Sequence, residues 1–365
     1  MARMTAIRIR LATLAVLATA MAWPAAADAT WTIRGHGFGH GVGLSQWGAY
    51  GYANHGTGYK RILHHYYTDT KIASGHGRVR VLLGSGEGAI GFNGAGRACG
   101  RRLAARRDYS FAVVGRRVVL RDASGKRLAR CGREGKASSG VTIDGFGRYR
   151  GSLIAHAAGG NMLVINALGI EGYVKGVVPN EVPSTWPADA LRAQAVVART
   201  YGLATDRRGP FDQYDDTRSQ VYGGRRSETR QTNRAVSGTA KQVVAYNGQL
   251  AITYYFSTSG GQTENSEFGF AGGNPVAYLK SVDDPYDKAS PVHRWKETFS
   301  DSKLASRLGG LFEGRLRAIR ILQTGRSPRI VRARVVGSSA SKTVSGDTLR
   351  ARLGLRSTWA KFIHR

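Results

Sequence analysis

A helix with almost no polar face is the feature that most restricts how this chain can fold. Pro187 suits the first position of a helix, and Ser184 or Thr185 can cap its start. From there to about Ala204 the residues are mostly alanine and valine on every side, so the helix must be buried over most of its surface. Other elements must therefore pack around it on several sides.

Two arginines lie on this helix and share one stripe of its surface. Arg192 and Arg199 are seven residues apart, or about 10 Å along the helix axis. A buried guanidinium needs anionic or carbonyl partners, because an unpaired buried charge is too costly. Two structural ion pairs would supply those partners. An anion-binding wall that faces a cleft would do so as well.

The remaining segments favour strands. Apolar runs with strand character recur in residues 77–158, and the segments 243–246 and 250–256 flank Asn247-Gly248, a strong signal for a two-residue hairpin. Glycine is frequent, with 49 of the 365 residues, which suits a fold with many turns. We therefore expect an α+β fold with mixed or antiparallel sheets, a buried alanine-rich helix next to the active site, and a β-rich subdomain.

The first residues have the pattern of an export signal. Three arginines precede an apolar run over residues 11–22, which is short for a membrane span. Small residues at 25–29 suit cleavage after Ala27 or Ala29, and an uncleaved anchor helix is the alternative. We expect a secreted, cell-wall protein with no stable membrane span after cleavage.

The net charge of +30 at pH 7 is strongly positive. Outside the cytoplasm the nearest polyanion is the cell wall, whose phosphates or carboxylates would attract such a surface, so we expect no nucleic-acid partner. A solvated basic surface without any specific partner is an equally good interpretation.

Cys99 and Cys131 are the only cysteines, and in an exported chain they favour one disulfide. Closing a loop of this size stabilises a protein by roughly 3 to 4 kcal/mol in the chain-entropy model. A zinc site would need two more ligands nearby, and only His76 is close in the sequence. We therefore expect no metal at this pair.

Glu181 lies shortly before the buried helix, among apolar neighbours that include Val182, Pro183 and Trp186. Such neighbours can desolvate a carboxyl and keep it protonated near neutral pH, as a general acid for a glycosidic bond requires. An adjacent arginine would instead favour the ionised form of the carboxyl and lower its pKa. Taken alone, a glutamate near a helix start is more often a cap or a dipole partner.

The residues around Glu181 also resemble a known family. They are similar to the core signature of the SpoIID/LytB family, which comprises stage II sporulation protein D and the amidase enhancers. The resemblance covers most of the chain beyond the signal sequence. The matching segments are 171–183, 186–187, 191–201, 219–224, 255–264 and 275–284.

This resemblance implies a lytic transglycosylase that cleaves peptidoglycan glycan strands, with Glu181 as catalytic acid and then base. It favours strands stripped of peptides by an amidase, in which each muramic acid exposes a lactyl carboxylate. No cofactor is implied, and because residues 257–259 lack the zinc-binding cysteine of some relatives, we expect no metal. The substrate-binding residues that the resemblance implies are Arg192, Arg199, Gln220, Tyr222, Ser257, Ser259 and Thr263.

A second family motif, rich in glycine and histidine, occupies residues 35–49. In the family it usually lies near the C-terminus, after a segment similar to 353–359, so the order here looks circularly permuted. That order predicts that the two ends of the exported chain are neighbours in the fold. The resemblance then places His40, Ser45 and Gln46 beside the active site, where they can contact sugar.

The family also supports an alternative function, a non-catalytic glycan-binding module that stimulates a cell-wall amidase. A basic, wall-anchored scaffold is a remoter alternative. The expected organisation is a signal peptide (1–29), a Gly/His-rich motif segment (30–73), a β-rich subdomain (74–158), a SpoIID-like catalytic core (159–300) and a C-terminal α+β segment that packs with the core (301–365).

Overall fold

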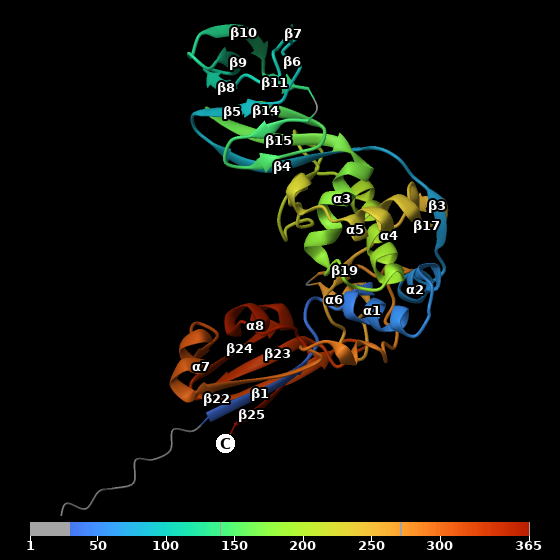
Figure 1. Cartoon of the computed structure of the whole chain (residues 1–365). Helices are drawn as coiled ribbons and strands as arrows, with labels where there is room; N and C mark the ends of the chain where they lie inside the picture. The colour runs from blue at the N-terminus through green and yellow to red at the C-terminus, as the bar shows by residue number, and fades with distance from the viewer. Residues whose placement is uncertain (1–29, 139, 271, 365) are drawn as a thin grey trace, which may run out of the picture.

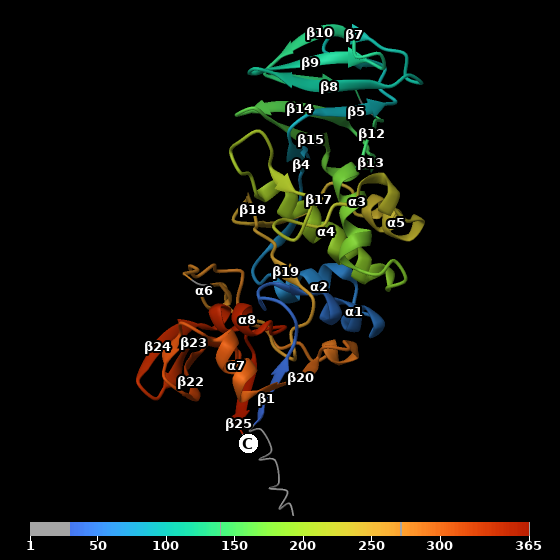
Figure 2. The same ribbon diagram turned by 90° about the vertical axis from the view of Figure 1, so that its left-hand side faces the viewer.

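The computed structural model describes residues 30–138, 140–270 and 272–364, so the predicted signal peptide lies outside the described residues. The described chain is elongated, with strands at both ends and most of the helices between them (Figures 1 and 2). This is the α+β fold that the sequence predicts. Within the described ranges, no helix is long and apolar enough to cross a membrane.

Two packed sheets form the β-rich part at one end. Their strand orders are β16-β4-β15-β14-β11-β6-β7 and β10-β9-β8-β5-β12-β13. Because β15 pairs with both β4 and β14, this part extends to residue 169, beyond the expected boundary at 158. The strands are β4 (Arg78–Gly86), β5 (Ala89–Asn93), β6 (Arg97–Ala98), β7 (Arg101–Arg102), β8 (Tyr109–Val114), β9 (Arg117–Asp122), β10 (Arg127–Gly132), β11 (Glu134–Ala137), β12 (Thr142–Ile143), β13 (Gly147–Arg148), β14 (Ser152–Ala158), β15 (Asn161–Gly169) and β16 (Gln213–Tyr214).

Helices α3 (Ile170–Glu181), α4 (Ala188–Ala204) and α5 (Arg230–Gly238) form the middle of the molecule, together with α1 (Gln46–Asn54) and α2 (Tyr59–Tyr66). The helix predicted from Pro187 is α4, and it is buried between two hydrophobic clusters. Leu191, Ala195 and Ala198 pack with the β-rich part, whereas Val196 and Val197 pack with α1 and α2. The absence of a polar face is thus explained by cores on two sides.

A small sheet with the order β18-β17-β3 lies against α4. Asn247 and Gly248, with φ of 48° and 78°, form the predicted hairpin turn between β17 (Gln242–Tyr246) and β18 (Gln249–Leu250). The expected second strand, 250–256, is interrupted after Leu250. Its far end forms β19 (Tyr255–Phe256), which pairs in parallel with β2 (Leu44–Ser45). The third strand of the small sheet is β3 (Lys71–Ser74).

The C-terminal part brings the two ends of the described chain together. Strand β1 (Thr30–His36) pairs with β25 (Ala360–His364), and Trp31 lies opposite His364. The predicted adjacency of the ends is confirmed, while circular permutation stays a hypothesis. The other elements of this part are α6 (Ser266–Gly269), β20 (Arg294–Ser300), α7 (Asp301–Arg307), β21 (Phe312–Glu313), β22 (Leu316–Thr324), β23 (Ile330–Gly337), β24 (Ala340–Ser345) and α8 (Gly346–Leu353).

A disulfide joins Cys99 to Cys131, with their Cα atoms 5.3 Å apart. Cys99 follows β6 of the seven-stranded sheet and Cys131 lies in β10 of the six-stranded sheet, so the bond connects the two sheets. It closes a loop that would otherwise be free in the unfolded chain.

We expect the exported protein to contain no free thiol, because both of its cysteines are used in this bond. Thiol counting on the unreduced, denatured protein measures this directly. Two reactive thiols per chain would contradict the disulfide, and the same assay after reduction is the positive control.

Candidate active site

A pocket of about 430 Å³ lies where segments from distant parts of the sequence meet. The glycine-rich motif contributes one wall, the ends of α3 and α4 contribute another, and β19 with its neighbours completes it. Aromatic rings make up much of the lining. The lining residues are Phe38, Gly39, His40, Gln46, Glu181, Tyr201, Thr217, Arg218, Ser219, Val221, Tyr254, Tyr255, Phe256, Ser257 and Phe270.

Glu181 is the last residue of α3. The helix ends there because Val182 precedes Pro183, and a residue before proline is pushed into extended geometry; Val182 has φ −140° and ψ 147°. Glu181 therefore lies shortly before α4, as the sequence shows, and also at the C-terminal end of the preceding helix. That end carries partial negative charge, which disfavours a carboxylate.

The surroundings of Glu181 favour its protonated form. Burial raises the pKa of Glu181, and this effect outweighs the hydrogen bonds that lower the pKa. The backbone N–H of Val221 donates to Oε1 of Glu181 at 2.9 Å, and the hydroxyl of Tyr255 and the amide of Gln46 also favour the charged form. The Gln46 amide donates to the Glu181 carbonyl oxygen at 3.2 Å.

The position of Tyr255 next to Glu181 is fixed by Gln220. The Tyr255 hydroxyl donates to Oε1 of Gln220 at 3.1 Å. The Gln220 amide in turn donates to the Tyr173 hydroxyl at 3.2 Å and to the Ala198 carbonyl at 3.3 Å. Burial raises the pKa of Tyr255 well above its ordinary value, so the phenol stays neutral. Gln220 thus lies behind the pocket wall and positions Tyr255.

His40 lines the pocket as a neutral imidazole. Nδ1 accepts from the Val42 N–H at 3.1 Å, which leaves Nε2 to donate to the Tyr255 carbonyl oxygen at 3.1 Å. Burial lowers the pKa of His40 to about 4. The ring therefore joins the glycine-rich motif to β19, and the geometry gives it a structural role in addition to its place in the lining.

Of the other predicted contacts, Gln46 and Ser257 lie at the pocket, whereas six residues do not: Ser45, Ser259, Thr263, Tyr222 and the two arginines of α4. Ser45 is buried and caps α1 by accepting from the Gly48 N–H at 3.1 Å. Ser259 donates to Asp287 at 2.8 Å, and Thr263 is buried with its hydroxyl bonded to the backbone of Val282. These two side chains satisfy internal partners instead of facing the pocket.

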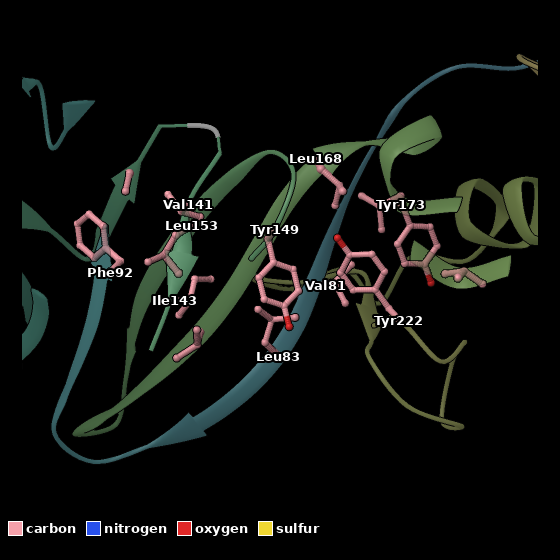
Figure 3. Close-up of a cluster of buried hydrophobic side chains, with 14 of the residues drawn as sticks. Val81, Leu83, Phe92, Val141, Ile143, Tyr149, Leu153, Leu168, Tyr173 and Tyr222 are labelled. Carbon is pink, nitrogen blue, oxygen red and sulfur yellow. The ribbon is translucent and has the colours of Figure 1, made fainter. Parts of the chain in front are cut away.

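Tyr222 is the fourth such residue. Its hydroxyl donates to Oδ1 of Asn166 at 2.8 Å, and its ring lies 5.3 Å from that of Tyr173, centroid to centroid. Figure 3 shows both rings inside the apolar cluster that joins the sheets to the helices. The predicted sugar contact of Tyr222 is therefore replaced by a packing role.

The two arginines of α4 each pair with a carboxylate of the same chain instead of forming an anion-binding wall. Arg199 is fully buried and makes a bidentate pair with Glu171, at 2.9 and 2.8 Å, and it also donates to the carbonyl oxygens of Val236 and Gln242 at 3.1 Å. Arg192 pairs with Asp189 at 3.2 Å on the surface. Neither lines the pocket, and both pair within the chain as the structural alternative predicts, while contact with substrate stays a prediction.

The aromatic lining is what sequence reasoning missed. Tyr254, Tyr255 and Phe256 are consecutive, and this run was the available signal, but its spacing predicts only a strand. Arg218 is the one arginine or lysine of the lining among the described residues. Its guanidinium lies 3.7 Å from the centroid of the Tyr214 ring and pairs with Asp216 at 2.7 Å.

The pocket therefore offers one carboxyl with a raised pKa, several flat apolar rings and a few neutral hydrogen-bonding groups. Flat rings suit the apolar faces of sugars, and a carboxyl with a raised pKa suits proton transfer. Among the described residues, no three histidine, cysteine, aspartate or glutamate side chains are grouped in a way that could hold a metal ion.

Comparison with known proteins finds similarity in the part of the chain that contains Glu181. Residues 158–246 match the family model described as SpoIID, Stage II sporulation protein, and this segment includes Glu181. An uncharacterized protein of Brachyspira hyodysenteriae is 37% identical over 173 residues, which cover 46% of each chain. The Stage II sporulation protein D of Bacillus subtilis is 32% identical over 208 residues, covering 52% of this chain and 58% of that protein.

The Amidase enhancer of Bacillus subtilis is 39% identical over 132 residues, which cover 36% of this chain and 17% of the enhancer. The chain thus spans about half the length of the first two relatives and a smaller share of the enhancer.

We expect Arg199→Ala to lower the free energy of unfolding by about 3 kcal/mol, because it removes a buried ion pair and leaves carbonyl groups unsatisfied. Arg192→Ala is the matched control on the same helix and should cost less than about 1 kcal/mol, since its ion pair is exposed. Urea denaturation measures both. Equal, small losses for the two variants would contradict the structural assignment of Arg199.

Proposed function

Since the chain belongs to the SpoIID family, we propose that it acts on the bacterial cell wall as a lytic transglycosylase of peptidoglycan glycan strands, with Glu181 as general acid and base. The observation that carries this proposal is a partly buried carboxyl with a raised pKa in an aromatic pocket of about 430 Å³. A pocket of this size and lining suits sugar rings.

The reaction needs two proton transfers through one carboxyl. Protonated Glu181 gives its proton to the glycosidic oxygen, and the bond from that oxygen to the sugar carbon breaks. The C6 hydroxyl of the same muramic acid then attacks the sugar cation and loses its proton to the Glu181 carboxylate. The product is a 1,6-anhydro end, the acid is regenerated, and no water is consumed.

The count of carboxyls in the pocket supports this reaction over ordinary hydrolysis. Glu181 is the single acidic side chain among the described lining residues. Most glycoside hydrolases use two carboxyl groups, the second to activate water or to attack the sugar. A hydroxyl of the substrate replaces that second group here, so one carboxyl is sufficient.

The contacts of Glu181 also indicate which oxygen carries the proton. The Val221 N–H donates to Oε1, so we assign the acidic proton to Oε2. After the proton leaves, the hydrogen bond from the Val221 N–H stabilises the carboxylate until it is protonated again. This donor is in place before the reaction begins.

Peptide-stripped strands are the substrate we propose, because their lactyl carboxylates give them negative charge. Arg192 and Arg199 pair with carboxylates of the same chain, so Arg218 is the cation available at the pocket. Its guanidinium is exposed, although it forms an ion pair with Asp216. Gln46 and Ser257 add neutral hydrogen bonds from the lining. An amidase would supply such strands, and export to the wall would bring the basic protein to them.

A glycan-binding module that stimulates a cell-wall amidase is the second candidate. The likeness to the Amidase enhancer of Bacillus subtilis favours it. The same pocket would then bind a strand without cleaving it, and the acidity of Glu181 would have no catalytic use.

We expect Glu181→Gln to reduce the formation of 1,6-anhydro ends by at least about 10²-fold, because an amide of similar shape has no acidic proton to give. Mass spectrometry of amidase-treated glycan after incubation with each protein measures these ends. Glu313→Gln, a change at an exposed glutamate in β21, is the matched control and should behave as the wild type.

Wild-type activity should fall as the pH rises through the raised pKa of Glu181, since only the protonated form can act as the acid.

If Glu181→Gln cleaves as well as the wild type, Glu181 is not catalytic. If the wild type makes no 1,6-anhydro ends on any form of peptidoglycan yet accelerates an amidase, the enhancer function replaces the enzymatic one.

A further inference from the structure

A second pocket, of about 880 Å³, lies in the C-terminal part of the protein. Strands β20, β1 and β25 provide most of its lining, and we call it the tryptophan pocket after Trp295 and Trp359. Four cationic side chains line it as well, and no acidic residue does so among the residues that the structure describes. The four are Arg34, Arg294, Lys296 and Lys361.

Three of these cations form a row across three adjacent strands. Arg34 of the central strand β1 lies directly opposite Lys296 of β20 on one side and Lys361 of β25 on the other. Directly paired residues project from the same face of a sheet with their Cβ atoms about 5 Å apart, and like charges in such positions repel.

No carboxylate of the described residues forms an ion pair with these three cations to offset the repulsion. All three side chains are exposed, and none of them takes part in the ion pairs formed within the described residues. Two nearby residues that are paired across strands, His36 and Arg294, add no negative charge. A bound anion would turn this repulsion into attraction, so the row points to an anionic ligand.

The aromatic rings of the pocket are held in fixed positions. Trp359 stacks on His36 with 4.7 Å between ring centroids and 14° between planes. The indole N–H of Trp295 donates to the Gly37 carbonyl oxygen at 2.8 Å. Both indoles remain partly exposed. Successive residues of a strand point to opposite faces, so Trp295 lies on the face opposite Lys296, whereas Trp359, stacked on His36, lies on the face of the cation row. The rigid indole of Trp359 therefore offers an apolar surface for the C–H face of a sugar whose carboxylate the neighbouring lysines and arginines can bind.

The tryptophan pocket lies next to the Glu181 pocket along the chain. His36 lines the former and Phe38 lines the latter, so at most about 7 Å of backbone separates their Cα atoms. The intervening Gly37 has φ 71°, and a Cβ there would lie 2.4 Å from the Thr258 carbonyl oxygen, so the bend between the pockets is fixed. Phe38 itself is 42% exposed between them.

We propose that the tryptophan pocket binds carboxylated sugar units of the same glycan strand that enters the Glu181 pocket. The identity of the strand rests on the proposed function, whereas the existence of the site rests on the cation row and the Trp359 indole. Such a site holds the strand at a distance from the reacting bond and makes binding depend on strand length. Short fragments would reach the Glu181 pocket alone.

The test compares Lys296→Gln/Lys361→Gln with its parent in a Glu181→Gln background, where no cleavage can occur. Peptide-free chains of N-acetylglucosamine and N-acetylmuramic acid are the probes, with two and with eight sugars. We expect affinity for the eight-sugar chain to fall by about tenfold, as the loss of two exposed ion pairs allows, with no change for the disaccharide. The effect should weaken at high salt.

Two controls make the result specific. Lys303→Gln/Arg320→Gln removes the same charge from the C-terminal part at residues outside the pocket lining, and it should bind the eight-sugar chain as its parent does. Uncharged chitin chains of eight sugars should lose no affinity in the lysine variant. A glycerol phosphate polymer tests whether any polyanion suffices, and competition by it as strong as by the glycan would overturn the assignment to sugar carboxylates.

The proposal is overturned if the lysine variant binds the eight-sugar chain as tightly as its parent, or if the control variant loses as much affinity. It is also overturned if the disaccharide is affected equally. These are binding measurements, so failure of the protein to cleave glycan would refute the proposed enzyme and leave them interpretable.

Discussion

The burial of helix α4 between two hydrophobic clusters is the constraint on which the rest of the structure depends. One side of the helix packs with the β-rich part through Ala195 and Ala198, and the other packs with α1 and α2 through Val196 and Val197. Arg199 crosses from this helix to Glu171 at the start of α3, which fixes the two helices against each other. Since α3 ends at Glu181, this packing places the acid at the pocket.

The site requires a carboxyl that is partly buried and still able to exchange a proton. A helix end and desolvation among apolar neighbours favour the neutral form of Glu181, while the Val221 N–H and Tyr255 favour the charged form. These opposing effects on the pKa of Glu181 balance in part, so the carboxyl can change between its protonated and its ionised form. Gln220 supports this arrangement from behind, because its amide holds the Tyr255 hydroxyl without introducing a charge.

The sequence predicts the elements of this fold better than their partners. Pro187 and the run rich in alanine and valine identify α4, and Asn247-Gly248 identifies a hairpin. A helix that is apolar all round does not reveal which neighbour covers which side, so the direction of Arg199 could not be read from its spacing. The pocket wall was equally hidden, because Gln46, Glu181 and Tyr255 meet only through long-range packing of segments that are far apart in the sequence.

The mechanism depends most directly on a Glu181 carboxyl that stays protonated at higher pH than an ordinary glutamate. Carbon-13 NMR of protein labelled at the glutamate side-chain carboxyls measures this, with the Glu181 signal identified by its absence from the Glu181→Gln variant. Burial predicts a titration midpoint above the ordinary glutamate value of about 4.3. A midpoint at or below that value would contradict the assignment of Glu181 as the acid.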